Sequence, residues 1–412
     1  MNEVVGDTSG ALAVPAHVPP HLVRSYPFTF GATTTRNPFD DIVPEIHRGP
    51  EIFFVLGYSG DGSPAWIVRR AADLRAIYLD TEHFSNRDQT PYAKIAGEDW
   101  SPIPLETDPP MHRLYRAFVA PLFSAKAISA MDDKIRASAT GYVAEIRKRG
   151  SCEFLSDFAF EFPIRVFLEF MGLPVNMIKQ FRKWEADLIH APDFQSLTDA
   201  VTGVVGYLRE VIEDRKRRPV DDLISYGTVV EVDGRKLTDS ELMGFCFNLF
   251  LGGLDTLSAN MSLQAWHLAR HPEHQKVLRE DPSLIPAAIE EFMRAYAAVN
   301  HGRVCKKKIE FRGITFMPGD LIVMSTTLAG RDPEEYDRPN EVILDRNPKH
   351  VALGHGPHLC LGMHLARRQM RIAIEEMLTG LPEFHIAAGS EIRFHLNAVM
   401  QPQTLPLRWQ SN

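Results

Sequence analysis

The sequence predicts a mainly α-helical fold with a minor β portion, built as a single large domain. Helical periodicity dominates residues 110–217 and 239–297, whereas short segments rich in β-branched and aromatic residues occur mostly toward the two ends. The 412 residues contain no internal repeat, linker or low-complexity stretch, and 44% of them are hydrophobic, which is enough to bury a large core.

The N-terminal part predicts an arm, a hairpin and a loop. Residues 1–25 are rich in Pro, Gly and small residues, which indicates a poorly ordered arm before a domain that spans 26–412. Residues 44–70 combine aromatic and β-branched residues with glycine turns and predict a hairpin, followed by a short helix over 71–80. Residues 85–110 show no clear period, and a loop of this length in a compact domain is usually functional.

The middle of the chain predicts consecutive helices. The helical pattern over 110–217 is interrupted near Gly150, 172–174 and 191–192. A small hairpin is expected over 228–237, where Asp233-Gly234 supplies the turn.

A long helix and two strands complete the prediction. Thr238 or Asp239 can cap a helix that runs to about residue 270, which makes it ~45 Å long. Beyond it we expect a helix over 283–297. Strands are expected over 309–316 and 321–325, on either side of the turn 317–320.

Charge and cysteine content exclude several classes of protein. The net charge is −8 and the charges are mixed along the chain, which argues against nucleic acid as a partner. The four cysteines are scattered without CxxC spacing, which is typical of unpaired thiols in a reducing compartment. No apolar run approaches the ~20 residues of a membrane span, and the N-terminus does not resemble a signal peptide. We therefore expect a cytoplasmic protein that does not enter membranes.

The long helix contains a defect at its centre. Gly252 and Gly253 are adjacent, and each costs roughly 1 kcal/mol relative to Ala in a helix interior. They can either let another helix pack closely or leave room for a flat ligand. Asp255 and Thr256 follow directly and could relay protons to such a ligand. Asn248, one turn earlier, can contact the ligand or bond a backbone carbonyl.

The stretch 353–368 surrounds one cysteine with glycines. Gly354, Gly356 and Gly362 flank Cys360, and a long helical pattern begins directly afterwards. A thiol at a helix N-terminus is favoured as thiolate by free backbone N–H groups and by the helix dipole. A loop that brings backbone close to something large and flat, with a thiolate at its end, suits a haem bound through sulfur.

Charged side chains could complete such a site. Glu291 and Arg294 lie at i, i+3 on one helix face, a spacing that is otherwise common among solvated charges. Four cationic or hydrogen-bonding residues suit a ligand with paired carboxylates, such as haem propionates: His112, Arg116, Arg303 and His358. The surroundings of Cys360 are basic and form either a solvated helix face or a docking surface for an acidic electron donor: Arg346, Lys349, His350, Arg367, Arg368 and Arg371.

These motifs together resemble the cytochrome P-450 superfamily of haem-thiolate monooxygenases. The cysteine loop resembles the family pattern Phe-Gly-x-Gly-x-His/Arg-x-Cys-x-Gly, with Leu353 in place of phenylalanine. Glu291 and Arg294 are similar to its Glu-x-x-Arg motif, and the segment from Gly252 to Thr256 to its oxygen-binding helix motif. The resemblance covers nearly the whole chain and implies one domain with a long central helix over the haem.

The resemblance also implies roles for residues. Cys360 would be the ligand of the iron of haem b, with Gly252, Gly253 and Gly362 beside the cofactor. Arg116, Arg303 and His358, helped by His112, would hold the propionates, and Glu291 with Arg294 would be structural. Asp255 and Thr256 would supply protons as O2 is activated. Electrons would come from NADH through an FAD-dependent reductase and a [2Fe–2S] ferredoxin.

A closer likeness is to bacterial camphor 5-monooxygenase-like enzymes, with departures. Trp100 stands where those enzymes have a substrate-anchoring tyrosine, and Asn248 where they have an aliphatic residue. Leu251, Val299 and Val399 match apolar pocket positions, so the resemblance implies a small apolar terpenoid or norisoprenoid, camphor-like or ionone-like. The third member of the family's Glu–Arg–Arg triad is expected to be missing, because Glu341 lies near its place.

Four alternatives remain open. A zinc site could use four neighbouring residues: His355, His358, Cys360 and His364. A haem protein could bind a ligand without turning it over, although mere binding needs no proton relay. The same fold could act as a peroxygenase or nitric-oxide reductase, or could oxidise a non-terpenoid aromatic or alicyclic substrate.

Overall fold

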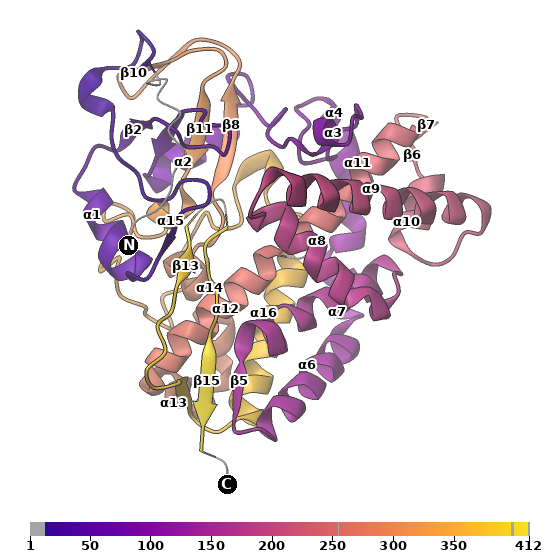
Figure 1. Ribbon diagram of the computed structural model, residues 1–412, viewed down its shortest axis with the longest axis vertical. Helices are drawn as coiled ribbons and strands as arrows, with labels where there is room; N and C mark the ends of the chain where they lie inside the picture. The colour runs from indigo at the N-terminus through magenta and orange to yellow at the C-terminus, as the bar shows by residue number, and fades with distance from the viewer. Residues whose placement is uncertain (1–12, 254, 397–398, 411–412) are drawn as a thin grey trace.

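The structure is a computed structural model that describes residues 13–253, 255–396 and 399–410. Helices form the larger part of the molecule, and the large sheet lies at the upper left in Figure 1, whereas the β6–β7 hairpin over 231–236 lies at the right. The predicted helix-rich fold with a minor β portion is confirmed. The hairpins over 52–68 and 231–236 and the helical breaks near Gly150, 172–174 and 191–192 are also confirmed.

The helices follow one another closely through the middle of the chain. Their bounds are α1 Val43–His47, α2 Ala71–Leu79, α3 Tyr92–Ile95, α4 Met111–Val119, α5 Ala125–Ser129, α6 Asp132–Arg147, α7 Glu161–Met171, α8 Ile178–His190, α9 Phe194–Arg217, α10 Leu223–Val229, α11 Asp239–Gly253, α12 Asp255–Arg270, α13 Pro272–Glu280, α14 Ile285–Ala295, α15 Thr326–Ala329 and α16 Met363–Gly380.

The strands form one five-stranded sheet and several small ones. Their bounds are β1 Thr33–Thr34, β2 Ile52–Val55, β3 Ala65–Val68, β4 Phe84–Ser85, β5 Ser151–Glu153, β6 Glu231–Val232, β7 Arg235–Lys236, β8 His301–Cys305, β9 Ile309–Phe311, β10 Ile314–Phe316, β11 Leu321–Met324, β12 Phe384–Ile386, β13 Phe394–His395, β14 Gln401–Pro402 and β15 Pro406–Trp409. The large sheet has the order β2-β3-β11-β8-β4, with β3 and β11 parallel and the other neighbours antiparallel.

The long helix predicted over 239–270 is present as α11 and α12. Leu254, between them, lies outside the described residues. Within the described part of the chain this is the one helix whose length and apolar composition would let it cross a membrane, and 71% of its most apolar window is buried inside the fold. That burial is typical of the core helix of a globular domain.

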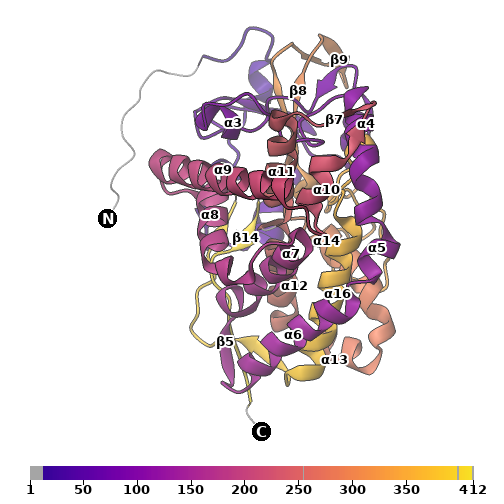
Figure 2. The ribbon, with the colours of Figure 1, turned by 90° about the vertical axis from the view of Figure 1, so that its right-hand side faces the viewer.

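The core consists of three hydrophobic clusters, two of which include residues of this helix. One joins α6, α12, α14 and α16, and a second joins α4, α7, α8, α9 and α11. The third lies under the five-stranded sheet around Trp66 and Phe316. Figure 2 shows α16 beside α6 and α14, below the strands of the large sheet.

Two stretches differ from their predicted form. Residues 309–316 are not one strand, because Arg312 and Gly313 adopt positive φ and turn β9 back onto β10. The neighbour of β11 is therefore β8 and not β10. A short strand, β5, which was not expected, pairs with β15.

The expected N-terminal arm divides into two parts. Residues 1–12 lie outside the described residues, whereas Val18 and Leu22 are buried against the sheet cluster. His17 Nε2 is 3.0 Å from Oδ2 of Asp320, the residue directly before β11 of the same sheet.

Candidate active site

The cysteine loop is a tight turn held by its own backbone. The Cys360 N–H donates to Leu353 O at 2.9 Å, and α16 begins three residues after the cysteine. Gly354 and Gly356 have φ of +76° and +68°, a region that L side chains rarely adopt. A Cβ on Gly356 would also lie 3.0 Å from a Leu79 methyl carbon, so the loop needs glycine there for two reasons.

The surroundings of the Cys360 thiol shift its pKa in opposite directions. Burial raises its pKa, while the Gly362 N–H and the guanidinium groups of Arg116 and Arg367 act in the other direction. Burial has the larger effect on the free thiol. A thiolate at this position is therefore best stabilised by a positive ion bound directly to the sulfur.

Four cationic or hydrogen-bonding residues predicted to surround the cysteine do converge. The rings of His112 and His358 lie 3.9 Å apart between centroids, and Arg116 donates to Leu359 O at 2.6 Å. Burial lowers the pKa of His112 to about 4 and that of His358 to about 3. Both imidazoles are therefore neutral near pH 7.

Arg303 is the more deeply buried of the two arginines. Its side chain is 5% exposed, lies over the Tyr78 ring at 5.2 Å, and donates to Gly302 O at 2.6 Å. Burial lowers its pKa to about 10, which still leaves it charged. Among the described residues no carboxylate forms an ion pair with Arg303 or Arg116, because the nearest acid, Asp108, bonds Ser85 and Lys306 instead.

These features fit an anionic, flat ligand carrying a metal ion. A buried guanidinium without a partner is costly, and a ligand carboxylate would neutralise it. His112 Nε2 is a further buried atom without a hydrogen-bond partner in the described structure. A Cβ placed on Gly252 or on Gly362 would meet nothing within 4 Å, so both glycines border open space. The residues present therefore fit haem bound through Cys360.

Gly253 has a different surrounding from Gly252. A Cβ on Gly253 would collide with the Phe167 ring of α7. Close packing of another element, one of the two readings of the glycine pair, therefore explains Gly253, whereas Gly252 faces open space.

Asp255 is buried at the start of α12. Its carboxylate is 3% exposed, and Oδ1 accepts a hydrogen bond of 3.0 Å from the Gln401 amide. Oδ2 lies 3.7 Å from His190 Nε2 and has no hydrogen-bond partner in the described structure. Burial raises the pKa of Asp255 to about 7, although the Gln401 amide lowers it. This carboxyl can therefore gain and lose a proton near neutral pH.

Thr256 and Asn248 are half-buried polar residues of the same long helix. The Thr256 hydroxyl is 3.5 Å from Gly252 O, a weak contact that leaves it free to turn toward another partner. Asn248 lies one turn before Gly252 and next to Phe247.

The predicted substrate residues come from separate elements. Trp100 is 3% exposed and packs on Phe247 of α11 with 4.6 Å between ring centroids. Its indole N–H has no hydrogen-bond partner within the described residues. Val299 and Val399 form an isolated antiparallel β-bridge, and Leu251 is half-buried directly before Gly252.

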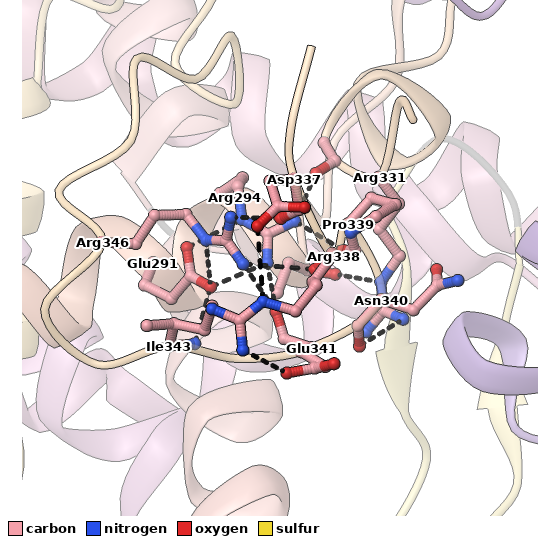
Figure 3. A network of polar contacts seen from close by, with 12 residues as sticks. Glu291, Arg294, Arg331, Asp337, Arg338, Pro339, Asn340, Glu341, Ile343 and Arg346 are labelled. Atoms are coloured by element: carbon pink, nitrogen blue, oxygen red, sulfur yellow. Dashed lines mark hydrogen bonds and ion pairs between the residues drawn. The ribbon is translucent and has the colours of Figure 1, made fainter. Parts of the chain in front are cut away.

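Glu291 and Arg294 form a fully buried ion pair, and the expectation of a missing third member is wrong. The two Arg294–Glu291 hydrogen bonds are 2.7 and 2.8 Å long, and both side chains are 0% exposed. Arg346, which the sequence predicts to lie on the basic surface, donates to Glu291 Oε1 at 3.0 Å (Figure 3). Glu341 contributes only its backbone carbonyl, at 2.8 Å from Arg294.

The surface around Cys360 is less basic than expected. Carboxylates pair with most of its cations: Glu290 with Arg367 and His350, Asp132 with Arg368, and Glu375 with Arg371. Lys349 is exposed, with no ion pair in the described structure. A groove of about 230 Å³ lies here between α5, α14 and α16.

Several residues of the site carry no signal in the sequence. Gln401 and His190 contact Asp255 from more than sixty residues away in the chain, and neither belongs to a motif. His301, two residues before Arg303 on β8, also belongs to no motif, and its Nδ1 is 2.5 Å from the Tyr78 hydroxyl. β8, which carries His301, pairs with β11, and β14, which carries Gln401, pairs with β13.

The zinc alternative has no geometric support. In the described ranges, no three side chains of His, Cys, Asp or Glu gather closely enough to hold a metal ion. The His358 ring instead lies against the His112 ring, tilted by 38°.

This chain is similar to a sequence family and to several known proteins. The sequence model described as Cytochrome P450 matches residues 175–403. The probable cytochrome P450 127A1 of Sinorhizobium fredii is 36% identical over 402 residues, which cover 96% of this chain and 97% of that protein. The steroid C26-monooxygenase of Mycobacterium tuberculosis is 31% identical over 300 residues, which cover 71% of this chain and 81% of that protein. The crystal structure of cytochrome P450 CYP101C1 superposes with a TM-score of 0.84 at 32% identity, over 97% of this chain and 100% of the other.

Proposed function

The chain belongs to the cytochrome P450 family, and on that premise we propose that it inserts one oxygen atom of O2 into a C–H bond of a small apolar terpenoid or norisoprenoid. Monooxygenase chemistry with haem is the chemistry of the family. The observation that carries the proposal is that buried Arg303 and half-buried Arg116, neither with a carboxylate partner among the described residues, converge with two imidazoles beside a single cysteine.

The residues around Cys360 would hold the haem. Cys360 would bind the iron, and Arg116 and Arg303 would bind the propionates, because both guanidinium groups lack an anionic partner in the described structure. His112 and His358 are neutral near pH 7 and would donate hydrogen bonds without adding charge. When bound and reduced, haem supplies the activation of O2.

Asp255 and Thr256 would manage the protons of the reaction. Burial brings the pKa of Asp255 to about 7, so its carboxyl can both release and regain a proton at neutral pH. The Thr256 hydroxyl, on the next residue of α12, is only weakly engaged with Gly252 O and can pass a proton onward. A protein that only stores or senses a ligand has no use for this buried acid, so the non-enzymatic alternative is disfavoured.

The substrate side of the site would be apolar with one hydrogen-bond donor. Leu251, Val299 and Val399 would contact the carbon skeleton, and the unpartnered N–H of Trp100 would donate to an oxygen of the substrate. The Asn248 amide is a second polar group on this helix. A ketone of the camphor or ionone type combines an apolar body with such an acceptor.

The electron donor would be a [2Fe–2S] ferredoxin reduced by NADH through an FAD-dependent reductase. The family implies redox partners, and the groove next to α16 presents Arg367, Arg368 and Arg371. Their surface ion pairs are worth only about 0–1 kcal/mol each, so carboxylates of a partner can replace the internal ones. The four cysteines are free, which suits the reducing cytoplasm where we propose that the enzyme works.

Optical titration of the holoenzyme tests the substrate class. We expect camphor- and ionone-type ketones to shift the ferric haem from low to high spin, and expect NADH, reductase and ferredoxin then to yield a hydroxylated product. An aromatic or alicyclic non-terpenoid that binds more tightly than every terpenoid would replace our substrate assignment. Turnover with a flavodoxin but not with ferredoxin would replace the donor.

A further inference from the structure

Gln401 of β14 joins Asp255 to His190 of α8 through a single amide nitrogen. Its Nε2 lies 3.0 Å from Asp255 Oδ1 and 2.9 Å from His190 Nε2. A side-chain NH2 group has two hydrogens and only donates, so one N–H binds the carboxyl group and the other binds the imidazole. Gln401 is 2% exposed, which shields both hydrogen bonds from water.

This contact determines which nitrogen of His190 carries a hydrogen. Because Nε2 accepts from Gln401, the hydrogen of the neutral ring lies on Nδ1. Burial lowers the pKa of His190 to about 4, so the ring is neutral near pH 7. The ring of His395 stacks on it with 4.2 Å between centroids and holds the imidazole in this position. Near pH 7 the lone pair of His190 Nε2 is therefore occupied by the Gln401 N–H.

Without Gln401, this lone pair would be within reach of a proton on Asp255. Asp255 Oδ2 lies 3.7 Å from His190 Nε2, which is about 1 Å longer than a hydrogen bond from a hydroxyl. Oδ2 has no hydrogen-bond partner in the described structure, whereas Oδ1 is held by Gln401. An imidazole nitrogen is a stronger base than a hydroxyl or carbonyl oxygen, so an O–H group at Oδ2 would turn toward a free Nε2.

The other titratable groups around this carboxyl do not compete for its proton. Within the described ranges, His190 is the one basic side chain that lies within ion-pair distance of Asp255. Burial raises the pKa of Glu185 and of Tyr92, and the charge of Asp255 contributes to both shifts, so neither is a base near pH 7. Burial lowers the pKa of His395 to about 4, and its ring faces His190.

We propose that Gln401 is a positioning residue that keeps the Asp255 proton available to the reaction by occupying the Nε2 lone pair of His190. This inference rests on the proposed role of Asp255. With the amide in place, a proton on Oδ2 is not drawn to His190 and can be passed to Thr256. Without it, the proton is shared with Nε2 or transfers to it. Full transfer breaks the Oδ2–H bond and forms an Nε2–H bond, which leaves an aspartate and an imidazolium.

Histidine ¹⁵N NMR of the reduced, carbon monoxide-bound holoenzyme at neutral pH gives the first test, because this form of haem is diamagnetic. The His190 signals are identified by their loss in His190→Leu. We expect the Nδ1–H tautomer in the wild-type protein. In Gln401→Leu, the Nε2 signal should move toward that of a protonated nitrogen. Gln403→Leu, the same change at a half-buried residue of the same segment, should keep the wild-type signals.

Two results of this NMR experiment would overturn the inference. One is a wild-type His190 that carries its hydrogen on Nε2, and the other is an Nε2 signal that stays the same in Gln401→Leu. If Gln401→Leu does not fold, the tautomer of the wild-type protein decides alone.

Product formed per NADH in a double-mutant cycle gives the second test. With His190 present, Gln401→Leu should lower this ratio roughly fivefold, the effect of one competing hydrogen bond. In the His190→Leu background the same change should have a much smaller effect, because the competing base is gone. The bond from Gln401 to Asp255 is lost in both backgrounds, so the cycle isolates the effect that acts through His190. Equal losses in both backgrounds would contradict the inference.

Asp255→Asn separates this inference from the proposed function. If Asp255→Asn uncouples NADH use from product while Gln401→Leu has the same effect with and without His190, the inference about Gln401 fails alone. If Asp255→Asn leaves coupling unchanged, the proposed role of Asp255 fails, and the inference fails with it.

Discussion

Single residues decide how protons reach the site, and Thr256 is the simplest to test. Its hydroxyl makes only the weak 3.5 Å contact with Gly252 O. We predict that Thr256→Ala keeps haem and substrate binding but diverts most NADH away from product, because the proton path loses its last hydroxyl. Product and NADH consumption measured together report this, with Thr256→Ser as the control that keeps the hydroxyl. Unchanged coupling in Thr256→Ala would remove the relay assignment.

Asp255 should also make the stability of the folded protein depend on pH. Burial raises its folded-state pKa to about 7, above the ordinary 3.8, so the folded protein binds the proton more tightly than the unfolded chain does. The contribution of Asp255 to the free energy of unfolding is therefore largest below pH 4, decreases as the pH rises from 4 to 7, and stays constant above pH 7. We predict that the unfolding free energy of Asp255→Asn does not decrease between pH 4 and 7. The variant should therefore become more stable relative to the wild type by a few kcal/mol as the pH rises over this range. Thermal unfolding from pH 4 to 9 measures the gap, and a gap that does not change with pH would contradict the burial effect.

Trp100 should discriminate substrates by their oxygen. Its buried indole N–H has no partner among the described residues. We predict that Trp100→Phe weakens binding of a ketone by about 1 kcal/mol, roughly fivefold, because one hydrogen bond is lost. Binding of a terpene hydrocarbon of similar size should change little. Equal effects on the ketone and the hydrocarbon would assign Trp100 to packing alone.

At the scale of elements, three charged side chains fix the chain that leads into the cysteine loop. Arg294 donates to the carbonyls of Gly330, Pro339 and Glu341, and Arg346 donates to that of Asp337 (Figure 3). Glu291 accepts from both arginines and from the Ile343 N–H. The stretch 337–346 has no helix or strand, so these bonds replace the backbone ladder that it lacks.

This arrangement predicts unequal effects of removing the two arginines. Arg294→Ala leaves the buried Glu291 with less compensation and should cost about 3–5 kcal/mol of unfolding free energy. Arg346→Ala, at a partly exposed side chain, should cost about 1.5–3 kcal/mol. Denaturant unfolding and haem retention measure both, with the exposed Arg338→Ala as the matched control. An Arg346→Ala variant as stable as this control would show that Arg346 is not a third member of the network.

Elements were predictable from the sequence where one face of a helix or strand is apolar over several turns. The helices over 111–217 and the hairpin of β2 and β3 follow from periodicity and from glycine breaks. The β9–β10 turn was missed, because Arg312 in the left-handed region carries no warning in its residue type. The role of Arg346 was missed because its carbonyl partners depend on the path of the whole stretch.

For the molecule as a whole, motifs predicted the cysteine loop and the acid–alcohol pair, but not the groups that tune them. Gln401 of β14 and His190 of α8 reach Asp255 from two separate parts of the chain, and only the folded structure brings them together. The surface charge near Cys360 was overestimated for the same reason. The sequence counts the cations, whereas the carboxylates that pair with them lie on other elements.

The central claim is that this chain holds haem through Cys360, and the visible spectrum of the reduced protein under carbon monoxide tests it most directly. We predict the absorption band of a thiolate-bound haem for the wild-type protein, and its loss in Cys360→His with haem still present. A colourless protein, or a haem spectrum that is the same with and without the Cys360 thiol, would contradict the account.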